Sequence, residues 1–146
     1  MSIIVGIDRT PAGQASLAAA IEATKPMQKK LFIVPVAREG TKLDPASAAE
    51  LLEESKLQAS AAGVEASVLA TTPEKDSVDE FLRLAQDVDA SLIVIAMRQR
   101  FEVGRFILSN NALRIMLQAD RPVLAVKSSQ PPLQSGDESL QDPKQV

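Results

Sequence analysis

The chain has 146 residues, the usual length of one domain, and its net charge of -3 disfavours a nucleic-acid-binding protein. It contains no cysteine and no histidine, which excludes disulfides, thiolate zinc sites and catalysis by a serine–histidine pair. No apolar run is long enough to span a membrane, and no charged leader precedes the first run. We therefore expect a cytoplasmic protein with neither a membrane nor a nucleic-acid partner.

Five short apolar runs alternate with four helical patterns along the chain. The first and fourth runs are almost continuously apolar, which is typical of central strands covered on both faces. The third run alternates with polar residues and indicates an edge strand. This order predicts an α/β fold of the Rossmann-like or flavodoxin-like kind: a five-stranded parallel sheet, order 3-2-1-4-5, with helices on both faces. The predicted strands cover residues 2–7, 30–36, 64–70, 90–96 and 122–127.

The ends of the first two predicted helices are marked by capping residues. Thr10 precedes Pro11, and Asp44 precedes Pro45, so each pair fits an N-cap followed by proline in the first turn. Gly63 is placed to end the second helix in the left-handed conformation.

The third and fourth helices are predicted from apolar spacing. The fourth begins near Ser109 and Asn110, and we expect its three largest apolar residues to face inward. The apolar residues expected inside are Val78, Phe81, Leu82, Ala85 and Val88 in the third helix, and Leu113, Met116 and Leu117 in the fourth.

The last part of the chain, residues 128–146, is rich in Ser, Gln, Pro and acidic residues and has almost no apolar pattern. This composition predicts a disordered tail after a single domain at residues 1–127.

The predicted sheet order reverses between the first and fourth strands, where open α/β sheets bind their ligands. The loops at residues 6–13 and 96–111 would meet there. Asp8 in the first loop is suited to a ribose hydroxyl or Mg²⁺, although a turn or capping role explains it equally simply. Ser109 and Asn110 offer free N–H groups at a helix start, either for an anion or for ordinary capping.

The second loop is basic. Residues 97–114 contain four arginines against Glu102, which gives a local charge of about +3 that suits either phosphate or a solvated face. Neither G-x-x-x-x-G-K-[ST] nor G-x-G-x-x-G is present, so the common phosphate-binding motifs are missing. The four arginines are Arg98, Arg100, Arg105 and Arg114.

Three stretches of the chain together resemble the universal stress protein family across nearly all of residues 1–127. They are "IIVGIDRTPAGQASLAAAI", "DASLIVIAMR" and "VGRFILSNNALRIMLQADRPVLAVK". The resemblance implies the same five-stranded sheet, a homodimer joined along the last strand at residues 122–127, and ATP binding in many members but not in all. It also implies that Asp8 lies near a ribose and that the backbone of Val36 contacts adenine.

ATP-binding members of that family carry G-2X-G-9X-G-[ST] after the fourth strand. The matching positions here are Ala96, Gln99, Ser109 and Asn110, so all three glycines and the final Ser or Thr are absent. Side chains at these positions would occupy space that a triphosphate needs, because glycine alone permits the closest backbone approach.

We therefore expect a stress-response or regulatory module in which ATP binding is lost or weakened, with no catalytic residue and no metal site. In the alternative, Arg98 and Arg100 replace the missing glycines and hold AMP or ATP. These two nucleotides are the only candidate cofactors. An ATPase is the least supported of the functions, because few residues could carry out the reaction. An unknown protein partner stays open.

Overall fold

The computed structural model describes residues 2–37, 42–71, 75–100, 105–107 and 109–128, and for 98–100 and 105–107 it describes the backbone alone. The helices are α1 (Pro11–Met27), α2 (Pro45–Ala61), α3 (Ser77–Asp87) and α4 (Asn110–Gln118). The strands are β1 (Ser2–Ile7), β2 (Lys30–Pro35), β3 (Ala66–Val68), β4 (Ala90–Arg100), β5 (Arg105–Ile107) and β6 (Val123–Lys127). Most of the predicted tail lies outside the described residues.

Five parallel strands form the sheet in the order β3-β2-β1-β4-β6, which confirms the predicted topology. β1 pairs with β2 on one side and β4 on the other, and all six of its residues are buried. β3 lies at one edge of the sheet, as its mixed pattern predicted, and β6 lies at the other.

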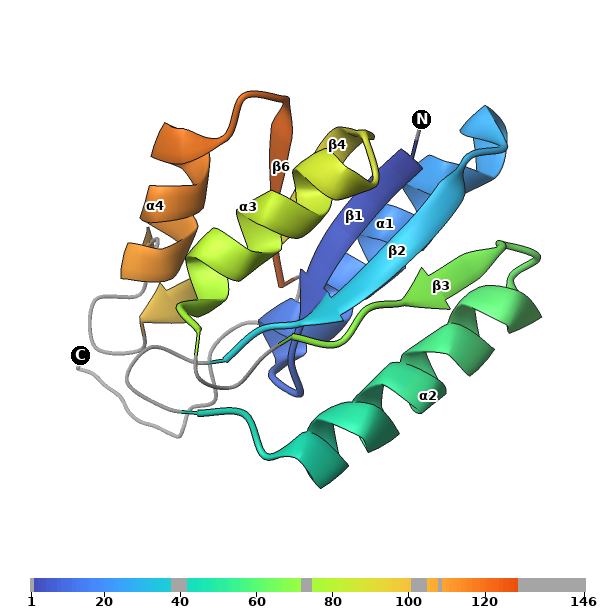
Figure 1. Cartoon of the computed structure of the whole chain (residues 1–146), viewed down its shortest axis with the longest axis horizontal. Helices are drawn as coiled ribbons and strands as arrows, with labels where there is room; N and C mark the ends of the chain where they lie inside the picture. Colours follow the sequence, from blue (N-terminus) through green and yellow to red (C-terminus); the bar gives the residue numbers. More distant parts are fainter. Residues whose placement is uncertain (1, 38–41, 72–74, 101–104, 108, 129–146) are drawn as a thin grey trace.

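Helices α1 and α2 cover one face of the sheet and α3 and α4 cover the other (Figure 1), and each face carries its own apolar cluster. Ile3, Val5 and Ile7 of β1 pack against α1 and α2, whereas Ile4 packs against α3 and α4. This alternation follows from the two-residue period of a strand, and it explains why a central strand must be apolar at every position.

The predicted helix caps are confirmed. Thr10 caps α1 by accepting a 3.0 Å hydrogen bond from the N–H of Gly13, and Asp44 caps α2 by accepting one from Ser47. Gly63 follows the last residues of α2 with a φ of +80°, a conformation that costs glycine little.

The predicted inward face of α3 is confirmed, but that of α4 is wrong. Leu113, Met116 and Leu117 are 45%, 42% and 76% exposed, while Ala112 and Ile115 are buried. A helix that begins at Asn110 presents positions 112 and 115 to the sheet, one turn apart, so the three larger residues fall on the outer face.

The segment after Ala96 is also different from the predicted loop. β4 continues to Arg100 and pairs antiparallel with β5, in the register Arg98↔Ile107, Gln99↔Phe106 and Arg100↔Arg105. A stretch without glycine adopts extended backbone readily, and β5 supplies the hydrogen bonds that keep it extended.

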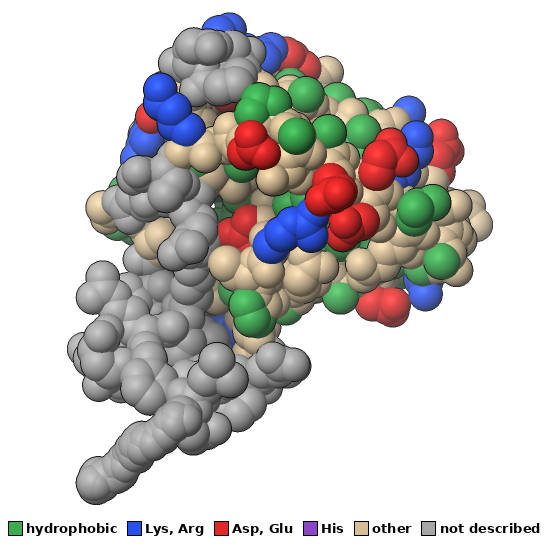
Figure 2. Space-filling model, turned by 90° about the horizontal axis from the view of Figure 1, so that it is seen from below, with side chains coloured by type: hydrophobic (Ala, Val, Ile, Leu, Met, Phe, Trp, Pro, Cys, Tyr) green, Lys and Arg blue, Asp and Glu red, His purple; other side chains and the backbone are tan. Residues whose placement is uncertain are grey.

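On the face seen in Figure 2, the acidic and basic side chains of the described residues lie interspersed. Arg9, for example, lies 3.2 Å from Glu54 and 3.5 Å from Glu50, which links the start of α1 to α2. Within the described ranges no helix combines the length and apolarity needed to cross a membrane.

Candidate functional site

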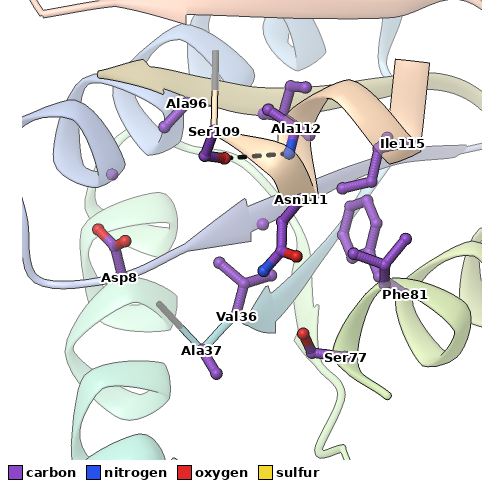
Figure 3. Close-up of a pocket in the computed structure, with 14 residues that line it drawn as sticks. Asp8, Val36, Ala37, Ser77, Phe81, Ala96, Ser109, Asn111, Ala112 and Ile115 are labelled. Atoms are coloured by element: carbon purple, nitrogen blue, oxygen red, sulfur yellow. Dashed lines mark hydrogen bonds between the residues drawn. The ribbon is translucent and has the colours of Figure 1, made fainter. Parts of the chain in front are cut away.

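A pocket of about 170 Å³ lies beyond the carboxyl ends of β1 and β4, where the strand order reverses. This is where the topology predicts a ligand. Its walls come from the ends of β1, β2 and β4 and from the first turns of α1, α3 and α4 (Figure 3). It is lined by Gly6, Asp8, Gly13, Val36, Ala37, Ser77, Val78, Phe81, Ile95, Ala96, Ser109, Asn111, Ala112 and Ile115.

Asp8 organises the turn between β1 and α1. Its Oδ1 accepts hydrogen bonds from the N–H of Thr10, at 2.9 Å, and from the Thr10 hydroxyl. Its backbone carbonyl accepts a 3.0 Å hydrogen bond from the side-chain amide of Gln14. Asp8 therefore lines the pocket and also has the structural role in the turn that its sequence context suggested.

Two glycines allow this close packing. A Cβ at Gly13 would lie 2.1 Å from Oδ1 of Asp8 and 2.6 Å from its carbonyl oxygen, so α1 can start here only with glycine at this position. A Cβ at Gly6 would lie 3.0 Å from Cγ1 of Val36 and 3.4 Å from the Phe81 ring. The pocket thus keeps its shape through backbone atoms that lie unusually close to their neighbours.

The side of the pocket next to α3 and α4 is apolar. Phe81 is fully buried, and its ring lies beside Val36 and Ile115 (Figure 3). Val78 and Ile95 complete this wall. A flat apolar part of a ligand would be covered here, because buried aromatic and aliphatic side chains are what small-molecule sites use for this purpose.

The start of α4 forms a further part of the wall. Ser109 is the N-cap, and its hydroxyl accepts a 3.0 Å hydrogen bond from the N–H of Ala112. The partial positive charge of a helix start favours an anion nearby. Asn110, the predicted partner of Ser109, is not a lining residue, whereas the side chain of Asn111 is.

Arg114 is held by an ion pair at one side of this wall. Its guanidinium lies 3.1 Å from Oδ1 and Oδ2 of Asp76 and 3.4 Å from Asp79. The Arg114 hydrogen bonds, followed by the N–H of Asp79, hold the pKa of Asp76 below its ordinary value. One of the four arginines in the basic stretch is therefore neutralised by the start of α3.

A second hollow adjoins the pocket on the side of α2. It shares Asp8, Val36 and Ala37 with the first, and it adds the cationic residues Arg9 and Lys42. Among the described residues, no group of three or more acidic side chains is arranged to hold a metal ion.

The structure brings together four of the residues named from the sequence: Asp8, Val36, Ala96 and Ser109. The backbone of Arg98, Gln99 and Arg100 lies in the extended part of β4, and their side chains lie outside the described residues.

The contribution of α3 was missed. Ser77 and Val78 begin a helix that follows a strand, so βα topology already places them at the carboxyl edge of the sheet. Val78 and Phe81 were expected only as core residues, and Asn111, Ala112 and Ile115 were not singled out. The lining residues of α3 and α4 that the structure adds are Ser77, Val78, Phe81, Asn111, Ala112 and Ile115.

Comparison with known proteins finds one family. A model described as "Universal stress protein family" matches residues 1–127. A universal stress protein from Mycolicibacterium smegmatis is 31% identical over 128 residues, which make up 86% of this chain and 96% of that protein.

Solved structures share the fold. A universal stress protein from Archaeoglobus fulgidus has a TM-score of 0.75 and 26% identity, covering 87% of this chain and 98% of that one. A universal stress protein from the same organism in complex with dAMP has a TM-score of 0.67 and 23% identity, with the same coverage.

Proposed function

Because this chain belongs to the universal stress protein family, we propose that it is a stress-response module whose pocket binds adenosine or AMP in preference to ATP. The observation that carries the proposal is the pairing of β4 with β5. This antiparallel ladder includes position 99, one of the positions at which an ATP-binding loop would need glycine. A backbone hydrogen-bonded to a neighbouring strand is less available to surround a triphosphate.

The nucleoside end of the pocket supports the same proposal. Asp8 is the only charged side chain among the described lining residues, and a carboxylate suits ribose hydroxyls but repels phosphate. Val36 and Phe81 offer an apolar wall for a base. At about 170 Å³ the pocket is smaller than the ~300–1,000 Å³ of sites that enclose a whole drug-sized ligand, and this favours one nucleoside over an extended ATP.

The Archaeoglobus fulgidus protein, which has the same fold, was solved in complex with the nucleoside monophosphate dAMP, and this supports the proposal. For this chain we propose a binding function without catalysis, since Asp8 is the one acidic or basic group in the described lining and it is already engaged by Thr10.

Thermal unfolding with AMP, adenosine and ATP, each with and without Mg²⁺, tests the proposal. A ligand at about 100 times its Kd adds about 2.7 kcal/mol to the free energy of unfolding and raises the melting temperature clearly. We expect a larger rise with AMP than with ATP at equal concentration. An equal or larger rise with ATP would contradict the preference, and no rise with any nucleotide would reject nucleotide binding.

Arg98 and Arg100 offer the second way to hold a phosphate. If they contact it, the double substitution to alanine should remove the advantage of AMP over adenosine while leaving adenosine binding unchanged. If the advantage persists, the start of α4 is the better candidate, because its N–H groups and helix dipole remain.

We also propose that two copies associate through β6. This strand pairs with β4 and is the edge of the sheet in the described part of the chain. Leu124 on it is 42% exposed. Val123 and Ala125 of β6 pack against the same cluster as α4, a helix that exposes Leu113, Met116 and Leu117. An apolar edge of this kind is stabilised when a second copy covers it.

A further inference from the structure

Two polar side chains in the pocket have no hydrogen-bond partner among the described residues. Asn111 extends from the first turn of α4 and Ser77 from the first turn of α3, and both line the pocket. Figure 3 shows the Asn111 side chain reaching toward Val36 and Ser77, between Asp8 on one side and Phe81 on the other. Both residues are half-buried, so part of the water that would satisfy them is excluded.

Two hydrogen-bonding groups around them already have partners within the protein. The Ser109 hydroxyl accepts from the N–H of Ala112, and Oδ1 of Asp8 accepts from Thr10. The amide of Asn111 is therefore the polar group best placed to pair with a ligand beside the apolar wall. Leaving such a group without a partner is costly, which gives a complementary ligand an advantage.

The hydrogen-bonding pattern of an amide limits the class of ligand that Asn111 can recognise. Asn111 presents one acceptor and two donors in a plane, and this pattern complements an amino group beside a ring nitrogen, as on adenine. The adjacent wall of Phe81, Val36 and Ile115 covers a flat ring. Phosphate is the poorer match, because no described lining side chain carries a positive charge.

We propose that Asn111, assisted by Ser77, selects the base by hydrogen bonding to an amino-substituted purine edge. The proposal rests on the nucleoside-binding function proposed above and deepens it by naming the residue that sets base specificity. The ring lies against Phe81, and the sugar faces Asp8.

Calorimetric titration of two ligands tests this directly: AMP, and purine riboside 5′-monophosphate, which lacks the amino group. The wild-type protein should bind AMP roughly fivefold more tightly or better, the size of effect expected for one net hydrogen bond. Asn111→Ala should reduce this preference to near unity, because AMP loses two hydrogen bonds to the amide and the analogue loses only the one to its ring nitrogen. Ser77→Ala should reduce it in part.

Gln118→Ala is the matched control, since it removes an exposed amide from the other end of α4 and should leave both affinities unchanged. Folding is not at risk in Asn111→Ala, because alanine is a good helix former and no hydrogen bond of the Asn111 side chain is lost among the described residues. An equal loss for both ligands, or no loss for either, would overturn the assignment of Asn111 while leaving AMP binding intact. If the wild-type protein binds neither ligand, the proposed function itself fails.

Discussion

Arg114 in α4 donates hydrogen bonds of 3.1 Å to both carboxylate oxygens of Asp76, the residue that caps α3. One carboxylate thus satisfies the N–H groups of Val78 and Asp79 and also joins two helices that border the pocket. The capping role and the charge of Asp76 can be tested separately, because asparagine caps helices about as well as aspartate does.

We expect Asp76→Ala to lower the free energy of unfolding by about 1 kcal/mol through loss of the cap, and Asp76→Asn to lower it by less. Because the folded pKa of Asp76 is lowered, its ionised form stabilises the fold above the unfolded pKa of about 3.9 and the effect is lost as pH falls through the folded pKa. Urea unfolding should therefore show a larger advantage of the wild type over Asp76→Asn at pH 7 than at pH 3. If the difference in free energy of unfolding between the wild type and Asp76→Asn is equal at both pH values, the charge of Asp76 is not its cause.

Gly13→Ala should destabilise the protein, although a glycine-to-alanine change inside a helix ordinarily gains about 1 kcal/mol. The new Cβ would lie 2.1 Å from Oδ1 of Asp8 and within 2.8 Å of its backbone nitrogen, so the turn must shift. We expect a loss of about 1–3 kcal/mol in chemical denaturation, typical of overpacking. The reverse change at exposed Ala18 of the same helix, Ala18→Gly, is the control and should lose only the ordinary ~1 kcal/mol.

Ser109→Gly restores one of the three absent glycines without removing the helix cap entirely. Glycine at an N-cap costs only a few tenths of a kcal/mol relative to serine, whereas Ser109→Ala should cost about 1 kcal/mol. If the Ser109 side chain obstructs phosphate, ATP should bind Ser109→Gly more tightly than wild type, as measured by calorimetry. Unchanged ATP affinity would place the obstruction elsewhere, with Ala96, Gln99 or the β4–β5 ladder as the remaining candidates.

Leu124→Arg should shift the protein toward the monomer if β6 joins two copies, because a charged side chain would enter an apolar interface. Light scattering after gel filtration at micromolar concentration measures the mass. Leu57→Arg is the control, since Leu57 is 67% exposed on α2, away from this edge, and should leave the mass unchanged. A wild-type protein that is already monomeric would reject the association through β6.

The sheet order and the helix caps were predictable because local chemistry determines them. Thr10 with Pro11, and Asp44 with Pro45, specify helix starts whatever lies around them. The inward face of α4 was not predictable from apolar spacing, because two apolar faces compete and the smaller one, Ala112 with Ile115, packs inward. Only the space left between β4 and α3 decides this.

The candidate site was predictable where it follows the strand ends and not elsewhere. Asp8 and Val36 directly follow β1 and β2, and Ala96 ends the predicted fourth strand, so the topology brings all three together. Ser77 and Asn111 depend on the direction of single side chains in helix first turns, which spacing alone does not determine. The β4–β5 pairing was missed because the motif comparison treated residues 96–111 as one loop, although the Phe and Ile at positions 106 and 107 favour a strand.

The central place of β1 has a consequence for the order of synthesis. Its first residue, Ser2, pairs with Ala90, and its hydroxyl donates to the carbonyl of Val88. At the ~5–20 residues per second of translation, the 88 positions from Ser2 to Ala90 take roughly 4–18 s to make. Through that interval β1 has one edge that β4 does not yet cover. The first strand of the nascent chain is therefore protected only after a much later part of the sequence has been made.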